Sequence, residues 1–241
     1  MNTNHIQVLF LIGRPAAGKS EVIKYLKDTE EDQRVKRFGI APFIEIDDFP
    51  MLWAWFEEDK ILEEMGYPRL HTDSQGFFSH QYLWDLLIRR LDLEYRKLVI
   101  DKPKTSENKT IIIEFSRGAE HGGFSGAFQH FSTELLKKGA VLYIDVPFEE
   151  SLRKNRKRAN PDKPHSILEH SLPDDKLKKL YGESDWQEFS RGDDRFLHIQ
   201  GVKIPYAVFP NEDDVTTPGG AALGDRLEEC LKTLQERIEK R

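Results

Sequence analysis

Residues Gly13-Arg14-Pro15-Ala16-Ala17-Gly18-Lys19-Ser20 form the stretch of this 241-residue sequence that decides its fold. The stretch matches the pattern G-x-x-x-x-G-K-[S/T] at all of its fixed positions, which happens by chance in roughly one chain in a hundred of this length. An apolar run of strand-forming residues, Val8–Ile12, comes directly before it, and we expect a helix to start within Gly18-Lys19-Ser20 and to run through Leu26. A strand, a glycine loop and a helix in this order are the context that the pattern requires.

The chemistry of this loop predicts a site for a nucleoside triphosphate, and we expect Mg·ATP. Gly13 and Gly18 let the backbone turn tightly and approach phosphates without a Cβ clash. Backbone amides of the loop and of the following helix N-terminus would point at the phosphates. Lys19 would reach the β- and γ-phosphates, and the Ser20 hydroxyl would bind Mg²⁺. The expected nucleotide-binding residues are therefore Gly13, Arg14, Pro15, Ala16, Ala17, Gly18, Lys19 and Ser20, with Arg14 facing either phosphate or solvent.

The loop resembles that of the P-loop small-molecule kinases, the nucleoside and nucleotide kinase group. This resemblance implies an α/β protein with the P-loop NTPase fold, a three-layer arrangement around a parallel sheet, with a helical insertion on the acceptor side and a lid. It also implies ATP and Mg²⁺ as cofactors and a small-molecule phosphoryl acceptor, nucleoside-like or nucleotide-like. A GTPase is less well supported, because the sequence has no Asn-Lys-x-Asp and no Asp-x-x-Gly after the third expected strand.

Apolar strand patterns alternate with helical patterns along the chain, which predicts a parallel sheet with helices on both faces. The expected strands are Val8–Ile12, Phe43–Asp47, Thr110–Glu114, Val141–Val146 and Tyr206–Phe209. We expect a last helix from about Gly220 to the C-terminus, where leucines recur at spacings of three and four.

Two segments between the expected strands are too long to be simple connections. We expect one domain, residues 1–241, in which residues 49–109 form the acceptor-side insertion and residues 148–205 an insertion that contains the lid. The first insertion should contain a long helix around Leu83–Leu98. The aromatic residues near it either form its core or include one that stacks on a substrate ring: Trp53, Trp55, Phe77, Phe78 and Trp84.

Two adjacent carboxylates, Asp47 and Asp48, end the second expected strand, at the edge of the sheet where ligands of parallel α/β proteins bind. The sequence Asp47-Asp48-Phe49 is similar to the end of strand two in uridine and nicotinamide riboside kinases. In those enzymes an Asp accepts the proton of the attacking hydroxyl, which implies a catalytic and substrate-binding role for Asp47 or Asp48. Asp also favours helix N-caps, so the pair can divide the two roles.

Glu114 ends the third expected strand and, by the same resemblance, helps Ser20 to hold Mg²⁺ through water. The family has a glycine after this Glu, whereas this sequence has Phe115. Ser116 and Arg117 are similar to the Glu-Arg-Ser motif of deoxynucleoside kinases with the order changed. Arg117 would either bind an anion on the acceptor or pair with Glu120 one turn later.

A basic run follows the fourth expected strand, and helical geometry places Arg153, Arg156 and Lys157 on one face. The run resembles the arginine-rich lid of nucleotide and nucleoside kinases, in which arginines stabilise the transferring phosphoryl group. The expected catalytic residues are therefore Lys19, Asp47, Asp48, Arg153, Arg156 and Arg158. The alternative is a solvated helix end, where cations interact favourably with the helix dipole.

The composition limits the location and the partners. Net charge is −6, which argues against a surface that wraps nucleic acid, and no run approaches the roughly 20 apolar residues of a membrane span. The single cysteine, Cys230, excludes an internal disulfide and fits a reducing compartment. We therefore expect a cytoplasmic protein with a small-molecule partner and with neither a nucleic-acid nor a membrane partner. The oligomeric state cannot be predicted from these features.

The expected function is transfer of the γ-phosphoryl group of ATP to a small molecule. Two other functions stay open. An ATPase or nucleotide-binding regulatory protein without a small acceptor would account for Phe115 in place of glycine. A polynucleotide end kinase would use the same loop and lid, although the acidic net charge disfavours it.

Overall fold

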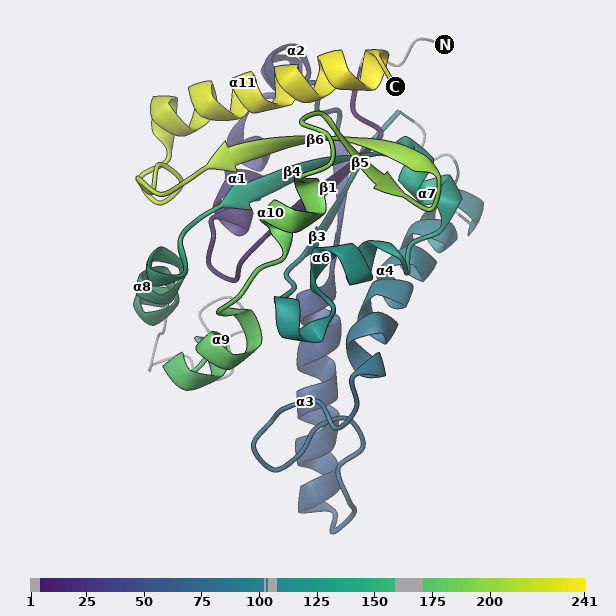
Figure 1. The fold of residues 1–241 in the computed structure, drawn as a ribbon, viewed down its shortest axis with the longest axis vertical. Coiled ribbons are helices and arrows are strands. Elements are labelled where there is room, and N and C mark those ends of the chain that lie inside the picture. Colours follow the sequence, from purple (N-terminus) through teal and green to yellow (C-terminus); the bar gives the residue numbers. More distant parts are fainter. Residues whose placement is uncertain (1–4, 102, 104–107, 159–170) are drawn as a thin grey trace.

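The computed structural model describes residues 5–101, 103, 108–158 and 171–241, and at its centre lies a six-stranded sheet (Figure 1). The strands lie in the order β2-β3-β1-β4-β6-β5, and β5 alone runs antiparallel to its neighbour. This order places the carboxyl end of β1 between β3 and β4, in the middle of the edge where open α/β sheets bind ligands. The strands are β1 (Val8–Gly13), β2 (Phe43–Asp47), β3 (Thr110–Phe115), β4 (Gly139–Asp145), β5 (Phe196–Ile199) and β6 (Val202–Pro210).

Helices cover both faces of the sheet, so the molecule has three layers. Val8, Phe10 and Ile12 of β1 pack into one core cluster, whereas Leu9 and Leu11 pack into another on the opposite face. The first cluster includes side chains of α4 (Tyr82–Asp101), α6 (Gly123–Phe128) and α7 (Thr133–Lys138). The second includes side chains of α1 (Lys19–Asp28), α2 (Glu31–Phe38) and α11 (Gly220–Glu239). Burial on both faces explains why these strands are continuously apolar, and the predicted three-layer α/β class is confirmed.

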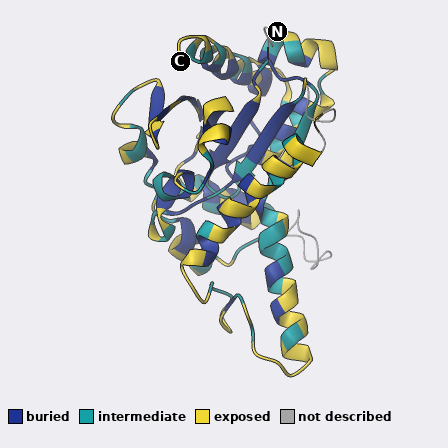
Figure 2. Ribbon diagram, turned by 90° about the vertical axis from the view of Figure 1, so that its right-hand side faces the viewer, coloured by how far each residue is buried: buried dark blue, intermediate teal, exposed yellow. Residues whose placement is uncertain are grey.

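The segment after β2 forms a long helix, α3 (Asp48–Glu64), that projects away from the sheet together with the connection to α4 (Figures 1 and 2). Asp59, which is fully buried, ties this connection to the helix. Its carboxylate accepts hydrogen bonds from the backbone amides of Leu70 at 2.7 Å and of Thr72 at 2.7 Å. A third apolar cluster then joins α3, α4 and α9 (Asp174–Tyr181) through Trp55, Trp84 and Tyr181. The sequence predicted an aromatic region before a long helix, but not α3 itself.

Three short helices among the described residues follow β4: α8 (Phe148–Arg158), α9 and α10 (Trp186–Ser190). Earlier in the chain, a short 3₁₀ turn, η1 (Ala119–His121), precedes α6. Part of the predicted lid insertion, residues 159–170, and part of the first insertion, residues 102 and 104–107, lie outside the described residues. Of the helices that the structure describes, none combines the length and the apolar character needed to cross a membrane.

Candidate functional site

The glycine loop, residues 13–20, joins β1 to α1, and its glycines stand where a side chain does not fit. Gly18 has a φ of +114°, and a Cβ there would lie 2.5 Å from Oγ1 of Thr216. A Cβ on Gly13 would lie 2.8 Å from the carbonyl oxygen of Ile144. Gly18 is also the N-cap of α1, and no side chain caps that helix end. The loop therefore presents backbone groups at the positive end of the α1 dipole.

A buried polar pair after β6 supports this loop, and the sequence did not point to it. The Asn211 side chain donates from Nδ2 to the carbonyl of Ala17 and to Oγ1 of Thr216, both at 2.8 Å. The backbone amide of Asn211 donates to the carbonyl of Asp145 at 2.8 Å, which ties the segment to β4. Asn211 and Thr216 are buried, so these bonds hold the loop against the end of the sheet.

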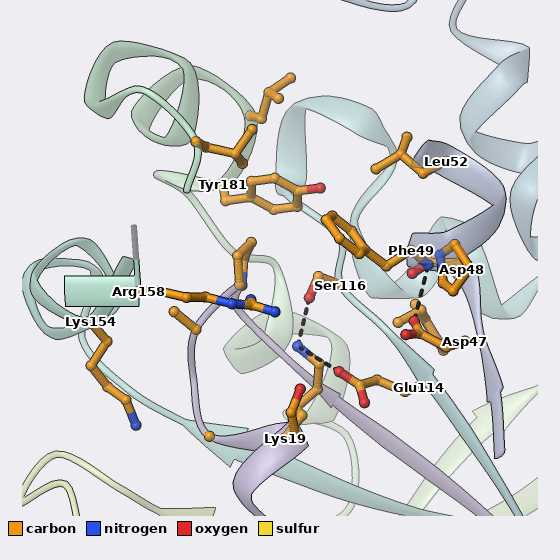
Figure 3. A pocket seen from close by; sticks show the side chains of 18 of the residues that line it. Lys19, Asp47, Asp48, Phe49, Leu52, Glu114, Ser116, Lys154, Arg158 and Tyr181 are labelled. Atoms are coloured by element: carbon orange, nitrogen blue, oxygen red, sulfur yellow. Dashed lines mark hydrogen bonds and ion pairs between the residues drawn. The ribbon is translucent and has the colours of Figure 1, made fainter. Parts of the chain in front are cut away.

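Lys19 points into the space beyond the ends of β1 and β3 (Figure 3). Its ammonium nitrogen donates to Oγ of Ser116 at 2.8 Å and to the carbonyl of Arg14 at 3.1 Å. It also lies 3.8 Å from a carboxylate oxygen of Glu114. The side chain is 6% exposed, so its charge acts in a poorly solvated environment.

Arg14 is half-buried, and its guanidinium contacts the end of α9. Its Nη1 donates to the backbone carbonyls of Tyr181 and, at 3.2 Å, of Gly182 at the end of α9. The guanidinium also lies 5.9 Å from the ring centre of Phe148. Arg14 therefore links the glycine loop to α9, a contact that the sequence did not predict.

Three acidic side chains meet where β2 and β3 end. Asp47 is paired with Glu114 in the register of the two strands, and Asp48 begins α3. Asp47 is the N-cap of α3, because its carboxylate accepts from the backbone amide of Phe49 at 3.0 Å. Asp47 thus takes the N-cap role that was expected of one member of the pair. Asp48, which is 9% exposed, does not cap the helix.

Burial raises the pKa of all three carboxyl groups. The pKa of Asp48 rises to about 8, first because of burial and then because of the charge of Asp47. The pKa of Glu114 rises to about 7, since burial outweighs the opposing charge of Lys19. The pKa of Asp47 is also raised by burial, against its bond to the Phe49 amide. Asp48 and Glu114 can therefore exchange protons near neutral pH, which is the range useful for acid–base chemistry.

Arg117 is buried against Trp84. Its Nη2 donates to the backbone carbonyl of Trp84 at 3.2 Å, and its guanidinium lies 4.8 Å from the centre of that ring. Nη1 is buried without a hydrogen-bond partner among the described residues. Burial lowers its pKa and the charge of Asp48 opposes this. The structure records no ion pair between Arg117 and Glu120 in the part of the chain that it describes, so the expected pairing with Glu120 is absent there.

The cations of α8 divide between two directions. Arg153 pairs with Glu150 at 2.6 Å and with Asp214 at 2.7 Å, outside the site. Arg156 is likewise directed outward, where its Nε donates to Asp174 at 2.9 Å. Arg158 lines the site, and its charge lowers the pKa of Asp47 and of Glu114 (Figure 3). Of the expected lid arginines, Arg158 therefore comes together with Lys19 and the acidic groups, whereas Arg153 and Arg156 do not.

Lys154 belongs to the site although the sequence analysis missed it. It is buried, and its ammonium nitrogen lies 2.8 Å from Asp214 and 2.9 Å from Oγ1 of Thr216. Lys154 and Arg158 are four positions apart and so share a helix face, which also carries Lys157 to the cavity lining. Of the face that the sequence predicted, Lys157 lines the cavity, whereas Arg153 and Arg156 lie one residue away from the lining positions Lys154 and Lys157.

These groups open into one cavity of about 720 Å³. Pro15, Ala16, Gly18, Lys19 and Ser20 of the loop line it, whereas Gly13, Arg14 and Ala17 do not. Of the aromatic residues expected near the site, Phe77, Phe78 and Trp84 line the cavity, and Trp53 and Trp55 do not. Other members of the lining are Asp47, Asp48, Phe49, Leu52, Phe56, Leu87, Glu114, Ser116, Lys154, Lys157, Arg158, Leu180 and Tyr181.

The residues expected to hold Mg²⁺, Ser20 and Glu114, both line this cavity. Among the described residues, no group of three or more His, Cys, Asp and Glu side chains is placed to hold a metal ion. Mg²⁺ usually keeps several waters and binds one or two protein ligands together with phosphate oxygens, so one hydroxyl and one carboxylate suit it. The two residues present fit a nucleotide-bound Mg²⁺ rather than a metal held by protein alone.

Comparison with known proteins adds little. No protein-family model matches the chain, and no curated protein matches it. One similar solved structure is TT1252 from Thermus thermophilus, which is 16% identical, covers 96% of this chain and 97% of that chain, and has a TM-score of 0.45. A likeness at this level carries no argument about function, so the functional case rests on the residues and their geometry.

Proposed function

We propose that this chain is an ATP-dependent phosphotransferase with a P-loop NTPase fold, in which α3 and α4 form the acceptor side and α8 and α9 form the lid. One observation carries the proposal. A single cavity brings together the glycine loop, Lys19, the acidic groups at the ends of β2 and β3, and the cations of α8 (Figure 3). Binding of a triphosphate, activation of a hydroxyl and stabilisation of a transferring phosphoryl group each need one of these parts.

The donor would bind at the loop. Backbone amides near Gly18 would hold the β-phosphate, and Lys19 would turn from Ser116 and Glu114 toward the β- and γ-phosphates. Ser20 would hold Mg²⁺ with Glu114 acting through water. A bound Mg²⁺ supplies neutralisation of the charge on the β- and γ-phosphate oxygens.

The acceptor hydroxyl would meet Asp48, whose carboxylate takes up its proton. Asp48 suits this role better than Asp47, because Asp47 caps α3 and because the pKa of Asp48 lies near neutral pH. A bond forms between the acceptor oxygen and the γ-phosphorus while the bond from that phosphorus to the ADP oxygen breaks. Arg158, with Lys154 and Lys157 beside it, would stabilise the charge on the transferring group.

An assay of ADP release from ATP across alcohols, nucleosides, nucleotides, sugars and vitamins tests this proposal. We expect at least one acceptor to raise ADP release well above the basal rate, and the Lys19→Ala variant to lose that increase. A basal rate that no acceptor changes would favour an ATPase or regulatory protein. Retained binding of a labelled oligonucleotide at moderate salt would favour a polynucleotide end kinase instead.

A further inference from the structure

The part of the cavity away from the glycine loop has apolar walls. Phe49, Leu52 and Phe56 of α3, Phe77 and Phe78 of the following connection, and Leu172 before α9 line this part, which we call the aromatic half. Each of these six side chains is only partly buried, so each presents apolar surface to the cavity. Covering such surface with an apolar ligand is favourable, and concave apolar walls with few polar groups are typical of small-molecule sites.

Polar side chains in the aromatic half are few, and they are Asp48, Tyr181 and Lys176. Asp48 lies at the end nearest β2, and the Tyr181 hydroxyl points into the cavity (Figure 3). Among the described residues that line the cavity, none is Asn, Gln or His. A nucleobase edge or a row of sugar hydroxyls needs several hydrogen-bond partners, because a buried polar group without a hydrogen bond is costly. Among the residues that the structure describes, the aromatic half offers few of them.

Most of the cations that line the cavity lie on its other side. Of the described lining residues, α1 and α8 contribute six cations: Lys19, Lys24, Lys27, Lys154, Lys157 and Arg158. The aromatic half contributes one cation, Lys176, and this cation already has contacts within the protein. Its ammonium nitrogen donates to the carbonyl of Gln75 at 3.2 Å and lies 5.3 Å and 5.0 Å from the ring centres of Phe56 and Phe77. A phosphate on the acceptor would thus lack the cluster of cations that binds one.

We propose that the acceptor is an uncharged alcohol with a planar, largely apolar body, and neither a sugar nor a nucleotide. Its body would lie against Phe49, Phe56 and Phe78, and its hydroxyl would reach the carboxylate of Asp48 at the junction with the donor side. This inference rests on the proposed phosphotransferase function. It differs from the nucleoside-like or nucleotide-like acceptor that the resemblance of the loop implies.

Binding can be measured apart from turnover. The probe is naphthalene-2-methanol, compared with uridine, glucose and UMP, in calorimetric titrations of the full chain with and without Mg·ATP. We expect saturable binding of naphthalene-2-methanol, and ADP release that rises with it, and no comparable binding of the other three compounds. Tighter binding or faster turnover with glucose, uridine or UMP would overturn the inference, as would failure of naphthalene-2-methanol to bind.

Matched variants locate the binding. Leu52→Gln keeps the approximate side-chain volume but adds an amide to the wall of the aromatic half. Leu86→Gln makes the same change at a 42% exposed position of α4 that does not line the cavity. We expect Leu52→Gln to weaken naphthalene-2-methanol binding at least about tenfold, with Leu86→Gln unchanged. Equal effects of the two variants would contradict the assignment. If Mg·ATP itself fails to bind, the proposed function is wrong. If Mg·ATP binds normally but a polar acceptor supports turnover, only the proposed class of acceptor is wrong.

Discussion

The ammonium nitrogen of Lys19 lies 3.8 Å from a carboxylate oxygen of Glu114, and the two side chains are 6% and 14% exposed. This ion pair links the loop after β1 to the end of β3. Before nucleotide binds, the ion pair keeps Lys19 directed into the cavity. A triphosphate at the loop would compete with the carboxylate for the ammonium group. The ion pair is therefore the point at which the proposed donor site and the acidic groups meet.

Lys19→Ala should raise the Kd for Mg·ATP at least about tenfold, because the variant removes the charge that faces the β- and γ-phosphates. Isothermal titration calorimetry measures this directly. Lys36→Ala is a suitable control, since Lys36 is exposed on α2 and does not line the cavity. Equal affinities of the two variants would exclude the loop as the nucleotide site.

Asp48→Asn should make the protein more stable at alkaline pH. The pKa of Asp48 is about 8 in the folded chain against an ordinary value of 3.8, so the folded state binds more protons between these values. The contribution of Asp48 to the stability of the wild-type protein must then fall as pH rises from about 4 to about 8. The advantage of Asn should grow over this range to a few kcal/mol, at about 1.4 kcal/mol for each pKa unit.

Urea unfolding of this variant at pH 5, 6.5 and 8 tests that expectation. The slope of unfolding free energy against pH should be shallower in Asp48→Asn than in the wild type, with the remaining slope coming in part from Glu114, whose pKa is about 7. Asp28→Asn changes an exposed carboxylate at the end of α1 and should keep the wild-type slope. Parallel slopes for all three proteins would show that Asp48 is ionised throughout.

The strands of the sheet were predictable because burial on both faces makes each one an apolar run. All five expected strands are confirmed, with β4 and β6 beginning earlier than their apolar patterns suggested. The sixth strand, β5, was missed because Phe196–Ile199 is only four residues long and lies in the polar segment between the fourth and fifth expected strands. The glycine at position 201 was a sequence signal, because two-residue hairpin turns favour glycine. In the structure Gln200 and Gly201 both have positive φ and join β5 to β6 as a two-residue hairpin.

The site was predictable to the extent that it follows strand ends. Asp47, Asp48 and Glu114 come together because parallel strands end at one edge. Side-chain direction on α8 was not predictable, because the ion pairs of Arg153 with Asp214 and of Arg156 with Asp174 join segments far apart in sequence. The support of the loop by Asn211 and Thr216 depends on the same kind of distant contact.

Gly18→Ala should lose both nucleotide binding and stability. The φ of +114° disfavours any residue with a side chain, and the new Cβ would lie 2.5 Å from Oγ1 of Thr216. We expect the free energy of unfolding to fall by about 1–3 kcal/mol, and the affinity for Mg·ATP to fall with it. Gly126→Ala provides the control, because nothing lies within 4 Å of its new Cβ. A Gly18→Ala protein as stable as Gly126→Ala would contradict the described loop geometry.

Arg158→Ala should lower kcat by about 10²-fold with little change in the Kd for Mg·ATP, because a cation that acts on the transferring phosphoryl group matters most in the transition state. Arg156→Ala is the matched control, since Arg156 lies on the same helix and pairs with Asp174 outside the cavity. Its kcat should stay within about twofold of wild type, because exposed ion pairs contribute little. Steady-state kinetics with any acceptor that supports turnover separate the two. A larger loss in Arg156→Ala than in Arg158→Ala would reverse the assignment of the two faces of α8.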